Sequence, residues 1–163
     1  MHKSYSPFGQ EKDSWYMEQA LKLARKAAEY DEVPIGAIIV NNEGKIIGRG
    51  YNLVEKMCTQ TAHAELRAIT QAGKKIGDWR LQGCWVYVTL QPCAMCLNSI
   101  KLSRCAGVVY GAESPLFGYH LDNTGQVSLY HRDTLAIIKG VNAENAALLL
   151  KQFFKQKRKH HSG

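Results

Sequence analysis

The chain has 163 residues and a formal net charge of +7, from 21 basic and 14 acidic side chains. This length predicts a single domain over residues 1–163 with one full core, and the basic balance favours a polyanionic partner such as nucleic acid. The longest apolar runs are only a few residues, so we expect neither a signal peptide nor a membrane partner. Five cysteines, an odd number, favour reduced thiols in the cytoplasm.

The first part of the chain predicts an arm, a helix and a hairpin. Residues 1–12 are polar and are expected to form a flexible arm. Asp13 or Ser14 fits the cap of a helix that runs to about residue 30, with apolar residues at helical spacing. Residues 35–40 and 45–50 then read as antiparallel strands, because the turn between them offers Asn and Gly for positive φ.

The middle and end of the chain predict a further alternation of helices and strands. After a loop over residues 56–60, Thr61 fits the cap of a helix over about 62–75. A dense β-branched and aromatic run at 85–90 predicts a central strand, followed by a helix at 93–102 and a strand at 106–110. A strand–helix–strand unit of this kind predicts parallel, right-handed pairing. A short strand at 134–139 and a helix at 141–159 close the chain.

Two short motifs carry the chemistry. His63 and Glu65 form H-x-E, and Pro92, Cys93 and Cys96 form P-C-x-x-C about thirty residues later. On a helix the two cysteines would share one face, and Pro92 would suit the first turn. One imidazole and two thiolates suit Zn²⁺, and three protein ligands leave a tetrahedral position open, as in catalytic rather than structural zinc sites.

Glu65 is the candidate proton carrier. It follows His63 by two residues, so on a helix it would point away from the imidazole and could face a bound water without being a ligand. A C-x-x-C pair alone would be weak evidence, because redox motifs share it, but the H-x-E and Pro92 strengthen the zinc interpretation. Three further cysteines are expected to be buried apolar residues or free thiols, namely Cys58, Cys84 and Cys105.

The combined H-x-E and P-C-x-x-C pattern is that of zinc-dependent nucleobase deaminases. Within this family the chain resembles the bacterial tRNA-specific adenosine deaminases, from about residue 15 to 159. The matching stretches are Glu32–Ala37, Gly50–Asn52, Thr61–Glu65, Tyr87–Leu90, and Ala146–Leu149 followed by Phe153 and Phe154.

The resemblance implies a fold, a reaction and roles for residues. It implies a three-layer α/β/α cytidine-deaminase-like fold, with a mixed sheet of about five strands and helices on both faces. It implies hydrolytic deamination of adenosine to inosine at the wobble position of a tRNA anticodon, by a zinc-bound water with Glu65 as proton shuttle. Substrate-binding positions carried over are Asn52, Ala64, Val33 and Leu90. By resemblance alone, we also expect a homodimer.

The basic tail at residues 151–163 has two interpretations. Its cations can simply complement the C-terminal end of a helix dipole. The resemblance instead implies contact with the anticodon stem-loop, where phosphates and unstacked bases would meet the side chains of Phe154, Lys155, Lys157 and Arg158.

One stretch and two single residues depart from the family pattern. Residues 111–131 lack the Gly- and Lys-rich stretch of the relatives, Gln91 replaces a usual Glu, and Gln60 replaces a usual Pro. His120 and His131 are expected to be loop or surface histidines, because three ligands already exist.

Two other functions stay open. One is a free nucleobase or nucleoside deaminase, for guanine or cytosine, with the same zinc core. The other is a non-catalytic, zinc-stabilised RNA-binding module, against which Glu65 argues.

Overall fold

The centre of the molecule is a five-stranded sheet with mixed pairing. The computed structural model describes residues 4–121 and 135–161. Strand order is β2-β1-β3-β4-β5; β1 pairs antiparallel with β2 and β3, whereas β3, β4 and β5 are parallel. The strands span Gly36–Val40 (β1), Ile46–Tyr51 (β2), Trp85–Leu90 (β3), Gly107–Ala112 (β4) and Ala136–Ile138 (β5). The predicted central strand and the parallel unit are both confirmed.

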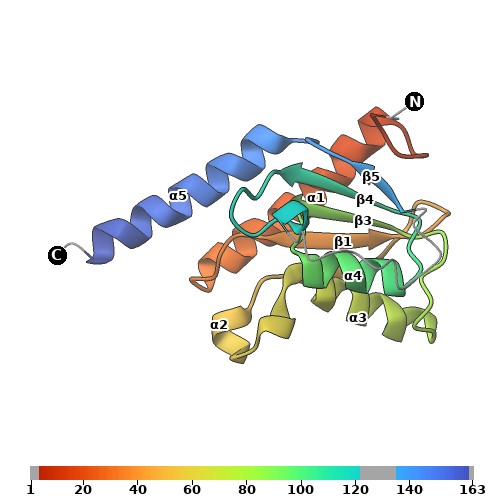
Figure 1. Ribbon diagram of the computed structural model, residues 1–163, viewed down its shortest axis with the longest axis horizontal. Coiled ribbons are helices and arrows are strands. Elements are labelled where there is room, and N and C mark those ends of the chain that lie inside the picture. Colours follow the sequence, from red (N-terminus) through yellow and green to blue (C-terminus); the bar gives the residue numbers. More distant parts are fainter. Residues whose placement is uncertain (1–3, 122–134, 162–163) are drawn as a thin grey trace.

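Helices cover both faces of this sheet, which gives three layers (Figure 1). α3 and α4 pack on one face, through alanines of α3 and the inward residues of β3 and β4. α1 and α5 cover the other face around Tyr16, Met17 and Tyr87. The helices span Gln10–Glu29 (α1), Val54–Met57 (α2), Ala64–Ile76 (α3), Ala94–Leu102 (α4) and Ala143–His161 (α5), with short 3-10 turns at Gln60–Ala62 (η1) and Tyr119–Leu121 (η2). The three-layer α/β/α architecture and the mixed sheet agree with the sequence prediction.

Glycines let two helices approach the sheet closely. A Cβ on Gly50 would lie 2.4 Å from the carbonyl oxygen of Ala64, the first residue of α3. On the opposite face, a Cβ on Gly36 would lie 2.0 Å from the carbonyl oxygen of Ala20 in α1. Because neither backbone could remain in place beside a larger residue, these glycines set the distances between layers.

The start of the first helix differs from the prediction of a flexible arm over residues 1–12 and a cap at Asp13 or Ser14. α1 begins at Gln10 after Gly9, so residues 10–12 are helical. Asp13 is buried within the helix and does not cap it. Its carboxyl group accepts hydrogen bonds from the Ser6 N–H (2.7 Å), the Ser6 hydroxyl and the Tyr87 hydroxyl (2.6 Å). These bonds fix residue 6 against the sheet.

The predicted loop and cap before α3 also need correction. Residues 54–57 form the short helix α2 where a loop was expected from residue 56. Thr61 lies in η1, whose cap is Thr59, and the residue that caps α3 is His63. At the other end of the chain, the basic residues lie within α5, as the predicted helix over 141–159 implies, and the helix extends to residue 161. Among the described helices, none combines the length and apolarity that crossing a bilayer requires.

Candidate active site

Three side chains from the two motifs converge in a cluster that can hold a metal ion. The Nδ1 atom of His63 lies 3.4 Å from the Cys96 Sγ and 3.7 Å from the Cys93 Sγ. One ligand atom from each residue lies within 4.8 Å of the others. His63 and Cys93 are half-buried and Cys96 is buried. An imidazole and two thiols at this separation match the donor set and size of a zinc site.

The backbone brings these donors together at the starts of two helices. His63 is the cap residue of α3 and Cys93 the cap residue of α4, and both have extended backbone conformations. Cys96 lies in the first turn of α4. The argument that Cys93 and Cys96 share a helix face is therefore wrong in detail, as is the placement of Pro92 within the helix. The donors meet because the two helix N-termini are adjacent, where free N–H groups and the helix dipole favour thiolates.

Gln60 holds the second nitrogen of the imidazole. Its Oε1 lies 3.1 Å from the His63 Nε2. Because an amide oxygen only accepts hydrogen bonds, Nε2 is the donor in this contact, and Nδ1 is the ring nitrogen that faces the cysteines and can bind a metal ion once it is deprotonated. Partners of this kind orient metal-binding histidines in proteins. The sequence marked Gln60 as a departure from the family, but gave no sign of this role.

Hydrogen bonds within the cluster favour a deprotonated Cys93 beside a protonated Cys96 and His63. The hydrogen bond from Cys96 lowers the pKa of Cys93 to about 4, so Cys93 is a thiolate at neutral pH. The hydrogen bond with Cys93 and burial raise the pKa of Cys96. The hydrogen bond with Cys93 also raises the pKa of His63. A metal ion that binds here therefore displaces protons.

Glu65 lies in the first turn of α3 and is almost fully buried, at 4% exposure. Burial is the main cause that raises the pKa of its carboxyl group, and the Cys96 thiol is within hydrogen-bonding reach. A raised pKa suits a group that must both take and return protons near neutral pH. The predicted reason for its orientation was wrong, however, because His63 is outside the helix.

The four predicted substrate-binding residues fall into two groups: Asn52 and Val33 contact each other, and Ala64 and Leu90 lie close in sequence to His63 and Cys93. The Asn52 side chain is buried and its Nδ2 donates to the Val33 carbonyl (3.3 Å), so these two residues are in contact. Ala64 follows His63 directly and is buried at the start of α3. Leu90 ends β3, three residues before Cys93, and is half-buried.

Glu32, next to Val33 in the chain, has a structural role that its sequence context does not indicate. It is buried, and its carboxylate accepts from the backbone N–H groups of Glu55 (2.8 Å) and Lys56 (3.3 Å). It therefore satisfies the start of α2, which follows Asn52. An acidic residue placed far away in sequence leaves no local signal of such a role.

The four predicted RNA contacts lie along the last turns of α5, which projects beyond the sheet (Figure 1). Phe154 is 45% exposed and packs edge-on against Phe153. Lys155 and Arg158 are exposed. Lys157 is half-buried, and its Nζ forms an ion pair with Asp31 at 2.6 Å. Lys157, one of the four predicted RNA contacts, is thus also bound to Asp31 within the protein.

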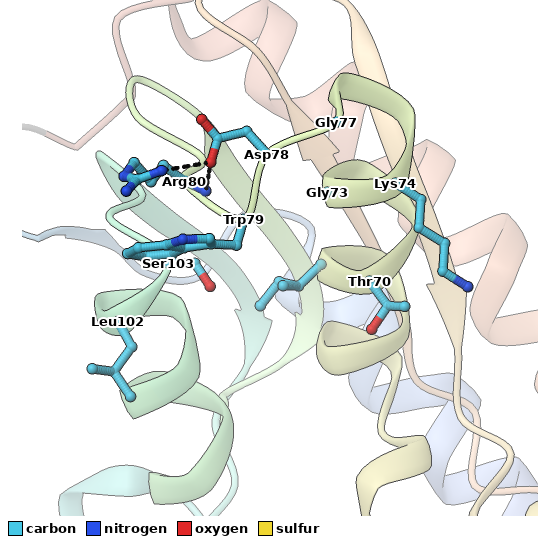
Figure 2. A pocket seen from close by; sticks show the side chains of 10 residues that line it. Thr70, Gly73, Lys74, Gly77, Asp78, Trp79, Arg80, Leu102 and Ser103 are labelled. Atoms are coloured by element: carbon cyan, nitrogen blue, oxygen red, sulfur yellow. Dashed lines mark hydrogen bonds and ion pairs between the residues drawn. The ribbon is translucent and has the colours of Figure 1, made fainter.

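A groove of about 920 Å³ lies away from the metal-binding cluster, at the C-terminal ends of α3 and α4. Figure 2 shows Trp79, Lys74, Thr70 and Leu102 around it, with Arg80 bonded to Asp78. The cluster lies at the opposite ends of these helices, so this groove is not the reaction site.

The other cysteines and histidines lie outside the cluster as far as they are described. Cys84 and Cys105 are buried and Cys58 is exposed, as free thiols. Burial raises the pKa of Cys105 to about 12, which makes it unreactive. His120 contacts Gln91 at 2.9 Å, and His131 lies outside the described residues.

Comparisons with known proteins agree with this arrangement. Residues 10–112 match the family model of the cytidine and deoxycytidylate deaminase zinc-binding region. A tRNA-specific adenosine deaminase from Bacillus subtilis (strain 168) is 43% identical over 149 residues, which cover 90% of this chain and 91% of that protein.

Two solved structures share the fold. One, from a study of A-to-I editing by tRNA:A34 deaminases at the wobble position, has a TM-score of 0.76 and 36% identity, over 84% of this chain and 99% of that one. The other, a guanine deaminase from Nitrosomonas europaea, has a TM-score of 0.76 but 21% identity, over 94% of this chain and 95% of that one. At that identity the second comparison shows the fold alone.

Proposed function

The chain belongs to the cytidine and deoxycytidylate deaminase family with a zinc-binding region, and we propose that it deaminates adenosine to inosine at the wobble position of a tRNA anticodon. The observation that carries the proposal is the pairing of a His63–Cys93–Cys96 cluster with a buried Glu65. The similarity to a tRNA-specific adenosine deaminase over nine-tenths of the chain supports the choice of substrate.

His63, Cys93 and Cys96 are the proposed zinc ligands. Their donor atoms fit the ion's preference, and Gln60 fixes the tautomer that His63 needs. When bound, zinc supplies the Lewis acidity that makes water nucleophilic at neutral pH.

Glu65 is the proposed proton shuttle. It removes a proton from the attacking water and delivers protons to the purine ring nitrogen and to the departing amino group. The net reaction consumes adenosine and water and releases inosine and ammonia. The burial that raises the pKa of Glu65 suits it to this two-way transfer.

The substrate pocket is proposed to comprise Asn52, Ala64, Val33 and Leu90. The Asn52 amide offers a donor and an acceptor to a purine edge. Its contact with the Val33 carbonyl holds the amide in one orientation. The Ala64 N–H, at the start of α3, is a further donor for the base edge.

On the RNA side, the end of α5 is proposed to contact the anticodon stem-loop. Lys155, Lys157 and Arg158 would meet phosphates, and Phe154 would contact a base. Progressive loss of affinity for the RNA with rising salt, reduced in a Lys155→Ala variant, is the expected behaviour.

We further propose a homodimer that acts in the cytoplasm. The ends of α3 and α4 expose the apolar side chains of Ile76 and Leu102, and the connection after α3 exposes that of Trp79. A second copy is the occupant that would cover them. Sedimentation should give twice the monomer mass, and Leu102→Glu should return the protein to monomers.

The test is an assay on tRNA transcripts with adenosine at the wobble position, with inosine detected in the product. Matched transcripts with guanosine or cytidine at that position serve as controls, and free guanine and cytidine test the alternative of a small-molecule deaminase. Deamination of free bases but not of RNA would overturn the proposal. A Glu65→Ala variant should keep zinc and lose turnover, whereas full activity would remove Glu65 from its role.

A further inference from the structure

The segment from Glu113 to Leu121 carries an exposed apolar tip. Leu116 and Phe117 are each 76% exposed, more than the other large apolar side chains among the described residues. A single exposed apolar residue needs no explanation, but two adjacent ones at such exposure indicate a contact surface.

One buried amide holds both ends of the segment. Gln91 is 5% exposed, and its Oε1 accepts from the Ser114 N–H at 3.0 Å. Its Nε2 lies 2.9 Å from the His120 Nδ1, to which it donates. The amide uses its acceptor on one end of the segment and its donor on the other, a combination that a carboxylate does not offer. The tip between Ser114 and His120 is therefore fixed from both sides.

Further contacts attach the segment beside the metal-binding cluster. The Tyr119 N–H donates to the Pro92 carbonyl at 2.9 Å, and Pro92 directly precedes Cys93. The Tyr119 ring packs edge-on against Tyr110 of β4, with centroids 6.5 Å apart. Gly118 allows this approach, because a Cβ there would lie 2.5 Å from the Gln91 Oε1. The apolar tip thus belongs to a segment joined to the strand–helix connection that carries a proposed zinc ligand.

We propose that this segment is a substrate-recognition element, in which Phe117, beside Leu116, stacks on a base that flanks the reacting adenosine. The inference rests on the proposed function, since an anticodon loop presents unstacked bases next to the one that enters the site. Aromatic side chains bind such bases through their π-faces with little dependence on sequence. Gln91 and His120 are positioning residues that act through the segment.

The first experiment measures KM and kcat on an anticodon stem-loop RNA for Phe117→Ala. The matched control is Tyr5→Ala, an aromatic residue with 48% exposure at the N-terminal end of the chain. We expect the KM of Phe117→Ala to rise about tenfold with kcat nearly unchanged, as loss of one base–aromatic stack would produce. Phe117→Trp, which keeps an aromatic ring, and Tyr5→Ala should both have a KM close to that of the wild type.

The second experiment removes the base instead of the ring. Stem-loops with an abasic residue on the 5′ or the 3′ side of the adenosine are assayed with the wild type and with Phe117→Ala. On one of the two abasic substrates, the wild type should lose as much affinity as Phe117→Ala loses on the intact stem-loop. On that abasic substrate, Phe117→Ala should lose no further affinity, because the ring and the base form the same contact. Additive losses on both substrates would overturn the stacking contact.

The positioning role is tested at His120. His120→Ala removes the acceptor for Gln91 and should raise KM for the stem-loop with zinc content unchanged. In His120→Asn, the Asn Oδ1 takes the place of the imidazole Nδ1 and should restore KM. Equal KM values for the wild type and both variants would overturn it.

These outcomes separate the inference from the proposed function. If the wild type deaminates no stem-loop, the proposed function fails. If the wild type deaminates the RNA and Phe117→Ala does so equally well, the proposed function stands and the recognition element is refuted.

Discussion

Two buried carboxyl groups on opposite faces of the sheet have different surroundings. Asp13, on the α1 face, is 1% exposed, and its oxygens accept from Ser6 and Tyr87. Glu65, on the α3 face, is 4% exposed and lies beside the thiol cluster, where burial raises its pKa. The first carboxyl group is saturated by donors that hold a segment in place, whereas the second has a raised pKa and is the proposed proton carrier. Burial alone therefore does not identify a catalytic acid; the neighbouring groups do.

The strongest test of this contrast replaces each carboxyl by its amide. Glu65→Gln removes the proton carrier, so we expect kcat to fall about 10³-fold, within the range for a general acid–base group. Because the amide also removes the cost of burying a charge, the variant should be no less stable than the wild type to thermal unfolding. Asp13→Asn is the matched control and should keep wild-type kcat. Comparable kcat losses in both variants would contradict the assignment of a proton-transfer role to Glu65 and a structural role to Asp13.

A pH series sharpens the comparison on the α3 face. The pKa values of His63 and Cys96 are raised, in both cases chiefly by hydrogen bonding with Cys93. Zinc must displace the protons that these groups retain, so zinc affinity should weaken as the pH falls. Each displaced proton weakens binding about tenfold per pH unit. Chelator competition between pH 8 and pH 6 measures the slope, and a flat profile would contradict the coupling.

Two glycines, Gly50 on the α3 face and Gly36 on the α1 face, allow the two faces of the sheet to be compared by added bulk. Gly50→Ala and Gly36→Ala each force a helix away from the sheet, and each should destabilise the fold by about 3 kcal/mol, the upper end for overpacking. Only Gly50 contacts the start of α3, at Ala64. We therefore expect weaker zinc binding in Gly50→Ala alone. Chemical unfolding and chelator competition on both variants test this, and equal zinc losses would argue against a local effect.

The smallest predicted effect is on the α1 face. Asp13→Asn keeps the side-chain shape but replaces an acceptor that faces the Ser6 N–H. The loss of one charge-assisted hydrogen bond should lower the free energy of unfolding by about 1.5 kcal/mol. Urea unfolding measures it. Ser6→Ala keeps this backbone N–H and removes only the hydroxyl bond to the other Asp13 oxygen, so its loss should be separate from, and add to, that of Asp13→Asn.

The strands were predictable because their signals are local. The run at residues 85–90 matches β3 at both ends, and Asn41–Gly44 forms the expected turn, with Gly44 at positive φ. That His63, Cys93 and Cys96 lie together was also predictable, since their types and spacing are specific to zinc chemistry.

Cap positions were not predictable, because a polar side chain looks the same whether it caps a helix or bonds elsewhere. Asp13 bonds to Ser6 and Tyr87, and the N-cap position of α3 is occupied by His63, whose side chain faces the cysteines, and not by Thr61. α2 depends on Glu32, more than twenty residues earlier, so its own sequence lacks the signal. The contacts of Gln60 with His63 and of Gln91 with His120 likewise appear only once the chain is folded.

His63 and Cys93 both occupy the residue immediately before a helix, and this has a consequence for redesign. The coordination geometry is then encoded by where each helix starts, and the outward surfaces further along α3 and α4 are decoupled from it. Substitutions on those surfaces should therefore leave the positions of the donors unchanged, even where they alter the proposed dimer interface. Inserting one residue between His63 and Ala64 would instead dismantle the cluster while leaving every donor in the chain.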